Sequence, residues 1–141
     1  MIVGCVDPGI HSGIAVLDDA NPIHLDVMLT DLIELAIDVI DVMRKHKVDV
    51  LVIENFVTGY RGGLDSNGLH TIRFIGALQV LGKLHKVVVV MQNPSDRKPF
   101  QDEARRLCWS KGDRVQHVSD AVAHIMAYHA KRGNRIDVPR P

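Results

Sequence analysis

The sequence predicts an α/β protein built on a mixed five-stranded sheet with helices on both faces. Two segments, residues 2–6 and 50–53, are continuously apolar, which is typical of strands buried on both sides of a sheet. Three strand-like segments precede the first helical pattern, and later strands alternate with helices. A meander followed by crossover units therefore gives a sheet with antiparallel strands on one side and parallel strands on the other.

Turn-forming residues divide the first part of the chain. Pro8-Gly9 follows the first strand, and residues 18–22, with two Asp, one Asn and one Pro, separate the second strand from the third. Thr30 is a candidate N-cap for a helix, because apolar residues recur at helical spacing from there to about residue 46.

The second part of the chain alternates helical and strand patterns. Residues 55–68 are rich in Gly and Asn and are expected to form a loop. A right-handed crossover places the strand at 48–54 beside the strand at 2–7. The expected elements, in chain order, are strands 2–7, 13–17 and 23–28, a helix at 30–46, a strand at 48–54, a helix at 69–85, a strand at 87–91, a short helical region from 93 to about 109, and a helix at 117–132.

Length and composition exclude several classes of protein. We expect residues 1–141 to form one domain, with 133–141 as a flexible tail. The apolar runs are of strand length, so neither a membrane span nor a signal peptide is expected. Cys5 and Cys108 are too few and too scattered for a disulfide framework, which favours the reducing cytoplasm.

Charge is distributed unevenly although the net charge is zero. Residues 1–70 contain 4 Lys and Arg against 11 Asp and Glu, a net charge of −7, whereas residues 71–141 contain 13 against 6, a net charge of +7. We expect an acidic helix stripe to form a solvated outer face, so that the remaining surface can be basic and bind DNA. The stripe consists of Asp31, Glu34, Asp38 and Asp41.

Three carboxylates and one imidazole fall where the predicted elements would bring them together. Asp7 and Glu54 end the two apolar strands, and His117 and Asp120 open the last helix. Carboxylates at the tips of buried strands project into a crevice at the edge of the sheet. Such groups repel one another unless a cation lies between them, and oxygen ligands suit Mg²⁺ or Mn²⁺. The pattern therefore predicts a metal-dependent phosphodiesterase site.

Three stretches of sequence resemble the RuvC family of Holliday junction resolvases, in the ribonuclease H-like superfamily. They are GCVDPGIHSGIAVLD at 4–18, VLVIENF at 50–56 and HVSDAVAHIMAYHAKRG at 117–133, and they occur in the family's order. The resemblance implies a ribonuclease H-like fold with a catalytic, metal-binding set. That set is Asp7, Glu54, His117 and Asp120, with two Mg²⁺ ions, for which Mn²⁺ can substitute.

The resemblance also implies the reaction and leaves some roles open. In the family, paired hydrolysis of junction strands leaves 5′-phosphate and 3′-hydroxyl ends. His117 is either a metal ligand or the residue that handles a proton of the attacking water. For His124, one turn beyond Asp120, a position facing the surface is favoured over a contact near the site. Ser12 is expected to form a hydrogen bond that stabilises the turn. The other histidines show no ligand spacing.

The resemblance to RuvC proteins implies DNA contacts from the loop after Glu54, and the charge distribution favours further contacts from the basic half. Tyr60 is the candidate for stacking on an unpaired base, and Arg61 is the candidate for a phosphate contact. Lys98, Arg105 and Lys111 lie in a basic segment, NPSDRKPFQDEARRLCWSKGD, that is shorter than its counterpart in RuvC proteins. This departure resembles bacteriophage resolvases, which accept several branched structures.

The resemblance implies a structure-selective endodeoxyribonuclease that acts on four-way junctions and other branched DNA as a homodimer, with the dimer formed through the helix at 69–85. Apolar positions of the helix at 69–85 spread over about 220° of the helical wheel, more than the roughly 100° stripe needed to face one core. Three alternatives remain: a non-catalytic module that binds branched DNA, a nuclease for RNA–DNA hybrids, and a phosphate-binding lobe of the actin or sugar-kinase type.

Overall fold

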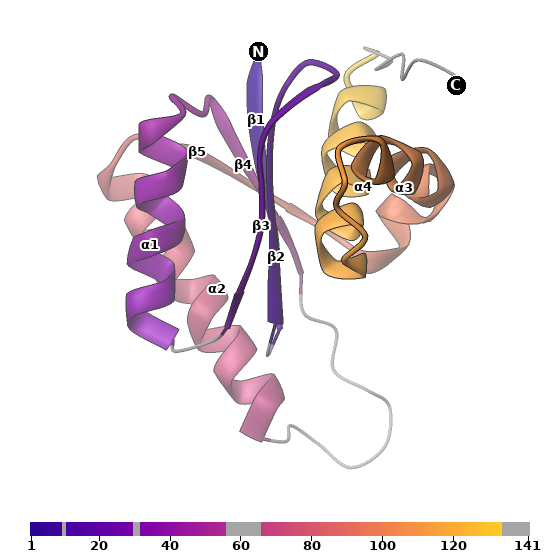
Figure 1. Ribbon diagram of the computed structural model, residues 1–141. Helices are drawn as coiled ribbons and strands as arrows, with labels where there is room; N and C mark the ends of the chain where they lie inside the picture. Colours follow the sequence, from indigo (N-terminus) through magenta and orange to yellow (C-terminus); the bar gives the residue numbers. More distant parts are fainter. Residues whose placement is uncertain (10, 30–31, 56–65, 134–141) are drawn as a thin grey trace.

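A computed structural model describes residues 1–9, 11–29, 32–55 and 66–133 (Figure 1). Within them lies a five-stranded sheet with the strand order β3-β2-β1-β4-β5. The elements are β1 (Ile2–Asp7), β2 (His11–Asp18), β3 (Asn21–Leu29), α1 (Leu32–Lys45), β4 (Val50–Glu54), α2 (Ser66–Leu84), β5 (Val88–Gln92), the 3₁₀ helix η1 (Pro94–Phe100), α3 (Gln101–Ser110) and α4 (Gln116–Lys131).

The sheet is mixed, as predicted. β1, β2 and β3 form an antiparallel meander, and β4 pairs in parallel with both β1 and β5. β4 therefore lies beside β1, and the register pairs Val6 with Ile53. Asp7 and Glu54, the next residues of the two strands, therefore lie side by side at the same end of the sheet. The crossover connections deliver both carboxylates to one edge of the sheet.

The boundaries of several elements differ from those expected. β2 and β3 are longer, because the two strands pair almost from end to end. α2 begins at Ser66, inside the segment 55–68 that was expected to be a loop; Ser and Asn are favoured at helix starts. The helical region at 93–109 divides into η1 and α3, and Pro99 lies inside η1. The rest of the predicted loop, 56–65, and residues 134–141 of the predicted tail lie outside the described residues.

Helices cover both faces of the sheet (Figure 1). Side chains alternate between the two faces along each strand. Val6, Ile14 and Ile53 face α1 and α2 in one core cluster. Cys5 and Val52 face α3 and α4 in the other. The expectation of helices on both faces is confirmed.

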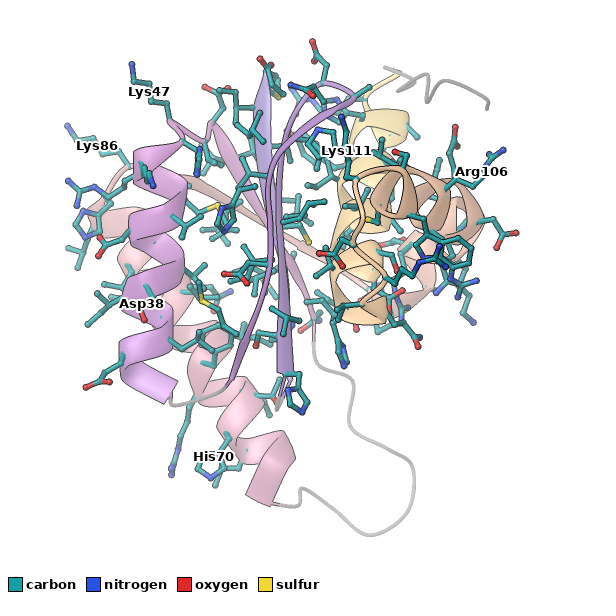
Figure 2. All side chains as sticks on the ribbon, viewed as in Figure 1. Asp38, Lys47, His70, Lys86, Arg106 and Lys111 are labelled. Atoms are coloured by element: carbon teal, nitrogen blue, oxygen red, sulfur yellow. The ribbon has the colours of Figure 1, made fainter. Side chains whose placement is uncertain are left out.

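α1 has a simple amphipathic pattern. Leu35, Val39 and Met43 are buried against the sheet. Of the predicted acidic stripe, Glu34, Asp38 and Asp41 are exposed, and Figure 2 shows Asp38 on the outer side of the helix. Asp31 lies outside the described residues. The outer face of α1 is therefore solvated, as expected.

α4 has no such solvated face over most of its length. Every residue from Val118 to His129 is buried, because the helix packs on β1 and β2 and is covered by α3 and η1. A polar side chain in this stretch must find its partners inside the protein. Asp120 and His124 are two such side chains.

Two further expectations bear on the type of protein. In the part of the chain that the structure describes, none of the helices has both the length and the apolar character that crossing a membrane requires. Cys5 and Cys108 are both buried as free thiols, in agreement with the predicted absence of a disulfide framework.

Candidate active site

Three carboxylates converge where β1, β4 and the start of α4 meet. Asp7 and Glu54 end adjacent parallel strands, and Asp120 lies in the first turns of α4. Asp7 and Asp120 are buried, and Glu54 is largely so. Arg97 contacts Glu54 and Asp120 together, and His117 contacts Asp7. The structure therefore brings the four predicted residues to one end of the sheet.

Gly13 allows α4 to approach the sheet this closely. It is paired with Asp7 across the β1–β2 hairpin. A Cβ atom built on Gly13 would overlap the backbone carbonyl group of His117. Because backbone atoms cannot turn aside as a flexible side chain can, a larger residue would push the start of α4 away from β2. A glycine in β2 thus positions His117 next to Asp7.

The close grouping of carboxylates changes the acidity of Asp7. Burial raises its pKa to about 7, and the negative charges of Glu54 and Asp120 act in the same sense, whereas the positive charge of Arg97 opposes the shift. The pKa of the neighbouring Cys5 thiol is also raised, first by burial and then by these carboxylates. The site therefore concentrates negative charge that favours a bound cation.

His117 lies at the outer side of this group. Its Nδ1 is 3.6 Å from Asp7 Oδ2, and its side chain is about half exposed. The ring stacks on that of His11, with the centroids 6.2 Å apart and the planes 29° from parallel. His11 was assigned no role from the sequence, because its position beside His117 arises from the packing of α4 on the β1–β2 hairpin. Two imidazoles thus border the carboxylates.

Ser12 follows His11 and has the role expected from the sequence. Its buried hydroxyl group donates a hydrogen bond to the Gly9 carbonyl oxygen (3.3 Å) and accepts one from the Gly9 N–H (3.4 Å). These bonds tie the turn that follows Asp7 to the start of β2. The side chain therefore shapes the hairpin that carries Asp7.

His124 is buried, which contradicts the expectation that it faces the surface. It has no exposed surface, and its Nε2 is 2.6 Å from Glu54 Oε2. In one orientation of the Gln92 amide, both of its polar groups form hydrogen bonds. The nitrogen donates to His124 Nδ1 (2.7 Å), and the oxygen accepts from the Tyr128 N–H (3.3 Å). Nδ1 is then an acceptor, so Nε2 carries the proton and donates to Glu54.

The reason for this error is the burial of α4. Asp120 and His124, four residues apart, lie on one face of α4, and a helix with that face solvated would leave His124 near the surface. η1 and α3 cover that face here, and His124 instead reaches back to the tip of β4. The i,i+4 spacing from Asp120 to His124 was the one signal in the sequence that pointed to the site.

Arg97 is a second functional candidate whose role was not foreseen. Its Nε lies 3.6 Å from Glu54 Oε2 and 3.6 Å from Asp120 Oδ1. Its Nη1 donates a hydrogen bond of 2.7 Å to the Pro94 carbonyl oxygen. Gln101 Nε2 is 3.4 Å from Asp120 Oδ1. Arg97 was seen in the sequence only as a member of a basic cluster, whereas the structure places its charge among the carboxylates.

The donor chemistry of the site fits a divalent cation. Carboxylate oxygens are the ligands that Mg²⁺ and Mn²⁺ prefer, and burial together with the negative charges of Glu54 and Asp120 raises the pKa of Asp7 although Arg97 is near. In the part of the chain that is described, no group of three or more His, Cys, Asp or Glu residues is already closed into a metal-binding cluster. Arg97 lies between Glu54 and Asp120 instead.

The predicted DNA contacts are only partly placed. Tyr60 and Arg61 lie outside the described residues. Lys98 on η1 and Lys111 after α3 are exposed, and Arg105 is paired with Asp102 at 3.3 Å. On the same side of the sheet, Figure 2 shows Arg106 projecting outward from α3.

An exposed aromatic residue accompanies these charges. Trp109, at the end of α3, is 49% exposed, and the Arg114 guanidinium lies over its ring at 5.1 Å from the centroid. Neither residue was assigned a role from the sequence. Aromatic and guanidinium groups side by side are suited to contacts with nucleic acid.

Comparison with solved structures identifies the fold. Thermus thermophilus RuvC in complex with a Holliday junction substrate matches with a TM-score of 0.76 and 20% identity, over 98% of this chain and 99% of that one. A second structure of Thermus thermophilus RuvC matches with a TM-score of 0.73 and 20% identity, over 98% and 100%. The yeast mitochondrial Holliday junction resolvase Ydc2 matches with a TM-score of 0.60 and 14% identity, over 92% and 79%.

These likenesses confirm the predicted ribonuclease H-like fold of the RuvC type. They extend over nearly the whole chain, including the elements that carry the four candidate residues. No protein-family model and no curated protein matches the sequence. The fold is thus that of the matched RuvC and Ydc2 structures.

Proposed function

We propose that this protein is a metal-dependent, structure-selective endodeoxyribonuclease that resolves four-way DNA junctions and other branched DNA. The observation that carries the proposal is the convergence of Asp7, Glu54 and Asp120 at one end of a RuvC-type sheet. A non-catalytic DNA-binding module would have no use for three buried carboxylates that repel one another. The proposal treats residues 1–141 as one nuclease domain.

The side chains of the site have separable tasks in this proposal. Asp7, Glu54 and Asp120 would hold two Mg²⁺ ions between them, for which Mn²⁺ can substitute. When bound, the ions lower the pKa of the attacking water and stabilise the leaving oxygen. His117, half exposed beside Asp7, either binds a metal or accepts a proton from the water.

Branched DNA is the proposed substrate because of the charge distribution as well as the fold. The exposed acidic residues of α1 lie on one side of the sheet, and Lys98, Arg105 and Lys111 lie on the side that also carries α4. One of the matched RuvC structures is a complex with a Holliday junction substrate. We extend that ligand to this chain, with Tyr60 and Arg61 as further contacts.

A homodimer is proposed because the junction has two-fold symmetry and needs two opposed cuts. α2 presents an exposed apolar stripe at helical spacing, formed by Ile72, Val80 and Leu84. Val80 is 61% exposed and Leu84 is 69% exposed. The opposite side of the helix, which includes Phe74 and Leu78, is buried in the core between α1 and the sheet. A second copy of this chain is the occupant that the symmetry of the substrate favours.

The dimer is tested by adding a charge to this stripe. Val80→Glu should yield a folded monomer in sedimentation that still nicks junctions but loses paired cutting. Ser110→Glu, which adds the same charge at an exposed position at the end of α3, on the other side of the sheet, should remain dimeric. Leu78→Glu should unfold the protein, since Leu78 is fully buried. A wild-type protein that sediments as a monomer at micromolar concentration, with and without junction DNA, contradicts the dimer.

The activity is tested with one panel of substrates in the presence of Mg²⁺. The panel contains a four-way junction, a three-way junction, a flap, a linear duplex and an RNA–DNA hybrid. We expect paired nicks near the centre of the four-way junction and no cutting with EDTA. Preferential cutting of the hybrid would favour the alternative hybrid nuclease. Tight junction binding without cutting would favour the binding module, and ATP binding would favour a kinase-like lobe.

The biological setting follows from the same proposal. Resolution of branched DNA belongs to recombination and repair. Two buried free cysteines are consistent with the reducing cytoplasm, or the host cytoplasm if a bacteriophage encodes the chain. The bacteriophage source rests only on the short basic segment between β5 and α4.

A further inference from the structure

Arg97 holds its positive charge at the place where the proposed metal ligands approach one another. Its Nε is equidistant, at 3.6 Å, from Glu54 Oε2 and Asp120 Oδ1, and its side chain is only 18% exposed. Two carboxylates from different elements are thus bridged by one guanidinium. Both carboxylates are largely buried. Water therefore stabilises their negative charges less than the Arg97 guanidinium does.

The position of the guanidinium is built into η1. Its Nη1 donates to the Pro94 carbonyl oxygen within the same turn. Asp96, the preceding residue, accepts from the Asn93 N–H at 2.9 Å and pairs with Lys131 at 3.0 Å. These contacts fix η1 to the end of α4. The charge is therefore held at the site by the fold and does not depend on a freely moving side chain.

The contact is electrostatic and lacks the geometry of a strong hydrogen bond. The Nε of Arg97 is buried and has no hydrogen-bond partner among the described residues. At 3.6 Å, its two carboxylate neighbours are beyond the range of a good N–H···O bond. A divalent ion in direct contact with the same oxygens would interact more strongly than this guanidinium.

We propose that Arg97 is the resident counter-cation of the metal-free site and competes with divalent cations for Glu54 and Asp120. This inference rests on the proposed function, since it assumes that these carboxylates bind metal. Two consequences follow. The free protein is protected from repulsion among its carboxylates, and its affinity for metal is lower than that of the same carboxylates without the guanidinium.

The test is Mn²⁺ binding to the full chain without DNA, measured by titration calorimetry. Arg97→Gln removes the charge and should bind Mn²⁺ about tenfold more tightly than wild type. Arg97→Lys keeps the charge and should bind within about twofold of wild type. Lys98→Gln removes the same charge from the next, exposed residue and is the matched control; it should also remain within about twofold.

Thermal unfolding provides a second measurement. In EDTA, Arg97→Gln should melt below wild type, because its carboxylates are left uncompensated, and Mn²⁺ should raise its melting temperature more than that of wild type. Arg97→Met, of similar length and without charge, should behave in the same way. A variant that is unfolded in EDTA and folds when Mn²⁺ is added also supports the proposal.

Two results would overturn the role of Arg97 alone. One is a wild-type protein that binds Mn²⁺ and cuts junctions, while Arg97→Gln and Arg97→Met bind Mn²⁺ no more tightly. The other is an equal gain in affinity in Lys98→Gln, which would indicate a general effect of net charge. A wild-type protein that neither binds Mn²⁺ nor cuts junctions overturns the proposed function together with this inference.

Discussion

α1 and α4 cover opposite faces of the same sheet, yet they place polar residues in opposite environments. Glu34, Asp38 and Asp41 of α1 are exposed along its outer side. On α4, Asp120 and His124 are buried between the sheet and a further layer made of η1 and α3. α1 is therefore an outer layer, whereas α4 lies in the middle of its half of the molecule.

This difference shows which polar side chains depend on partners within the protein. A carboxylate on α1 is hydrated by water and needs no partner. On α4 each buried polar group must be paired within the protein: Asp120 contacts Gln101 and Arg97, and His124 joins Gln92 to Glu54. Changes on α4 and at the strand ends should therefore affect cleavage strongly, and equivalent changes on α1 should not.

The largest effect is expected at Asp7. Asp7→Asn removes a negative charge at nearly constant shape and should reduce junction cleavage on the order of 10³-fold or more, because the proposed function makes Asp7 a metal ligand. Junction binding should be unchanged or tighter. Asp38→Asn, the same change on the exposed face of α1, should cleave like wild type. Near wild-type cleavage by folded Asp7→Asn would place the site elsewhere.

The same variant should alter stability in a pH-dependent way when metal is absent. The pKa of Asp7 is raised from 3.8 to about 7, so the native state retains a proton that the unfolded state has lost. Stability should therefore fall as pH rises from about 4 to about 7. Asp7→Asn removes this penalty and should be more stable than wild type at pH 8, by up to about 4 kcal/mol.

Denaturant titration with EDTA at pH 4 and pH 8 measures this effect. Asp7→Asn should have a higher free energy of unfolding than wild type at pH 8. The difference should be small at pH 4, where Asp7 is mostly protonated in native wild type and no buried negative charge lowers its stability. Excess Mg²⁺ should reverse the order at pH 8, since only wild type retains the full set of carboxylates. A pH-independent difference would contradict the assignment of the shift to Asp7.

The sequence predicted the carboxylates because their positions depend on the ends of elements. Asp7 and Glu54 end apolar strands, and adjacent parallel strands bring such ends together. Asp120 was placed by its position in the first turns of the last helix. These arguments need only the order and type of the helices and strands. The spacing of apolar residues along the sequence predicts both.

Arg97 and His124 could not be placed in this way. Their roles depend on which side chains meet across distant segments: His124 and Glu54 are 70 residues apart, and Arg97 meets both Glu54 and Asp120. These contacts depend on how η1 and α3 pack over α4, and tertiary packing sets that arrangement. For His124 the i,i+4 spacing from Asp120 was the only local signal, and for Arg97 its membership of a basic cluster did not indicate this contact.

His124 tests whether this buried layer positions Glu54. His124→Ala leaves Glu54 and Gln92 without their common partner and should lower cleavage about 10- to 100-fold, as is usual when the partner of a metal ligand is lost. The Mg²⁺ concentration for half-maximal rate should rise in parallel. His124→Gln, whose amide can still donate toward Glu54, should recover part of both losses.

A structural role alone would give a different result. Loss of stability without a change in Mg²⁺ dependence, or an equal defect in His124→Gln, would exclude positioning of Glu54. His46→Ala is the control, because His46 is half-buried at the end of α1, where its ring faces that of His24 at 5.3 Å. It should leave the Mg²⁺ dependence unchanged.

The smallest effect concerns the basic surface outside the site. If Lys98 and Lys111 contact phosphates, each change to Gln should weaken binding of all branched substrates alike, because phosphate contacts carry no structural selectivity. It should also lower the slope of log K against log salt by about one unit per lysine. Lys45→Gln, on α1, should leave the slope unchanged. Because a slope counts released ions, an unchanged value for Lys98→Gln and Lys111→Gln would remove both from the interface and shift DNA binding to other basic residues.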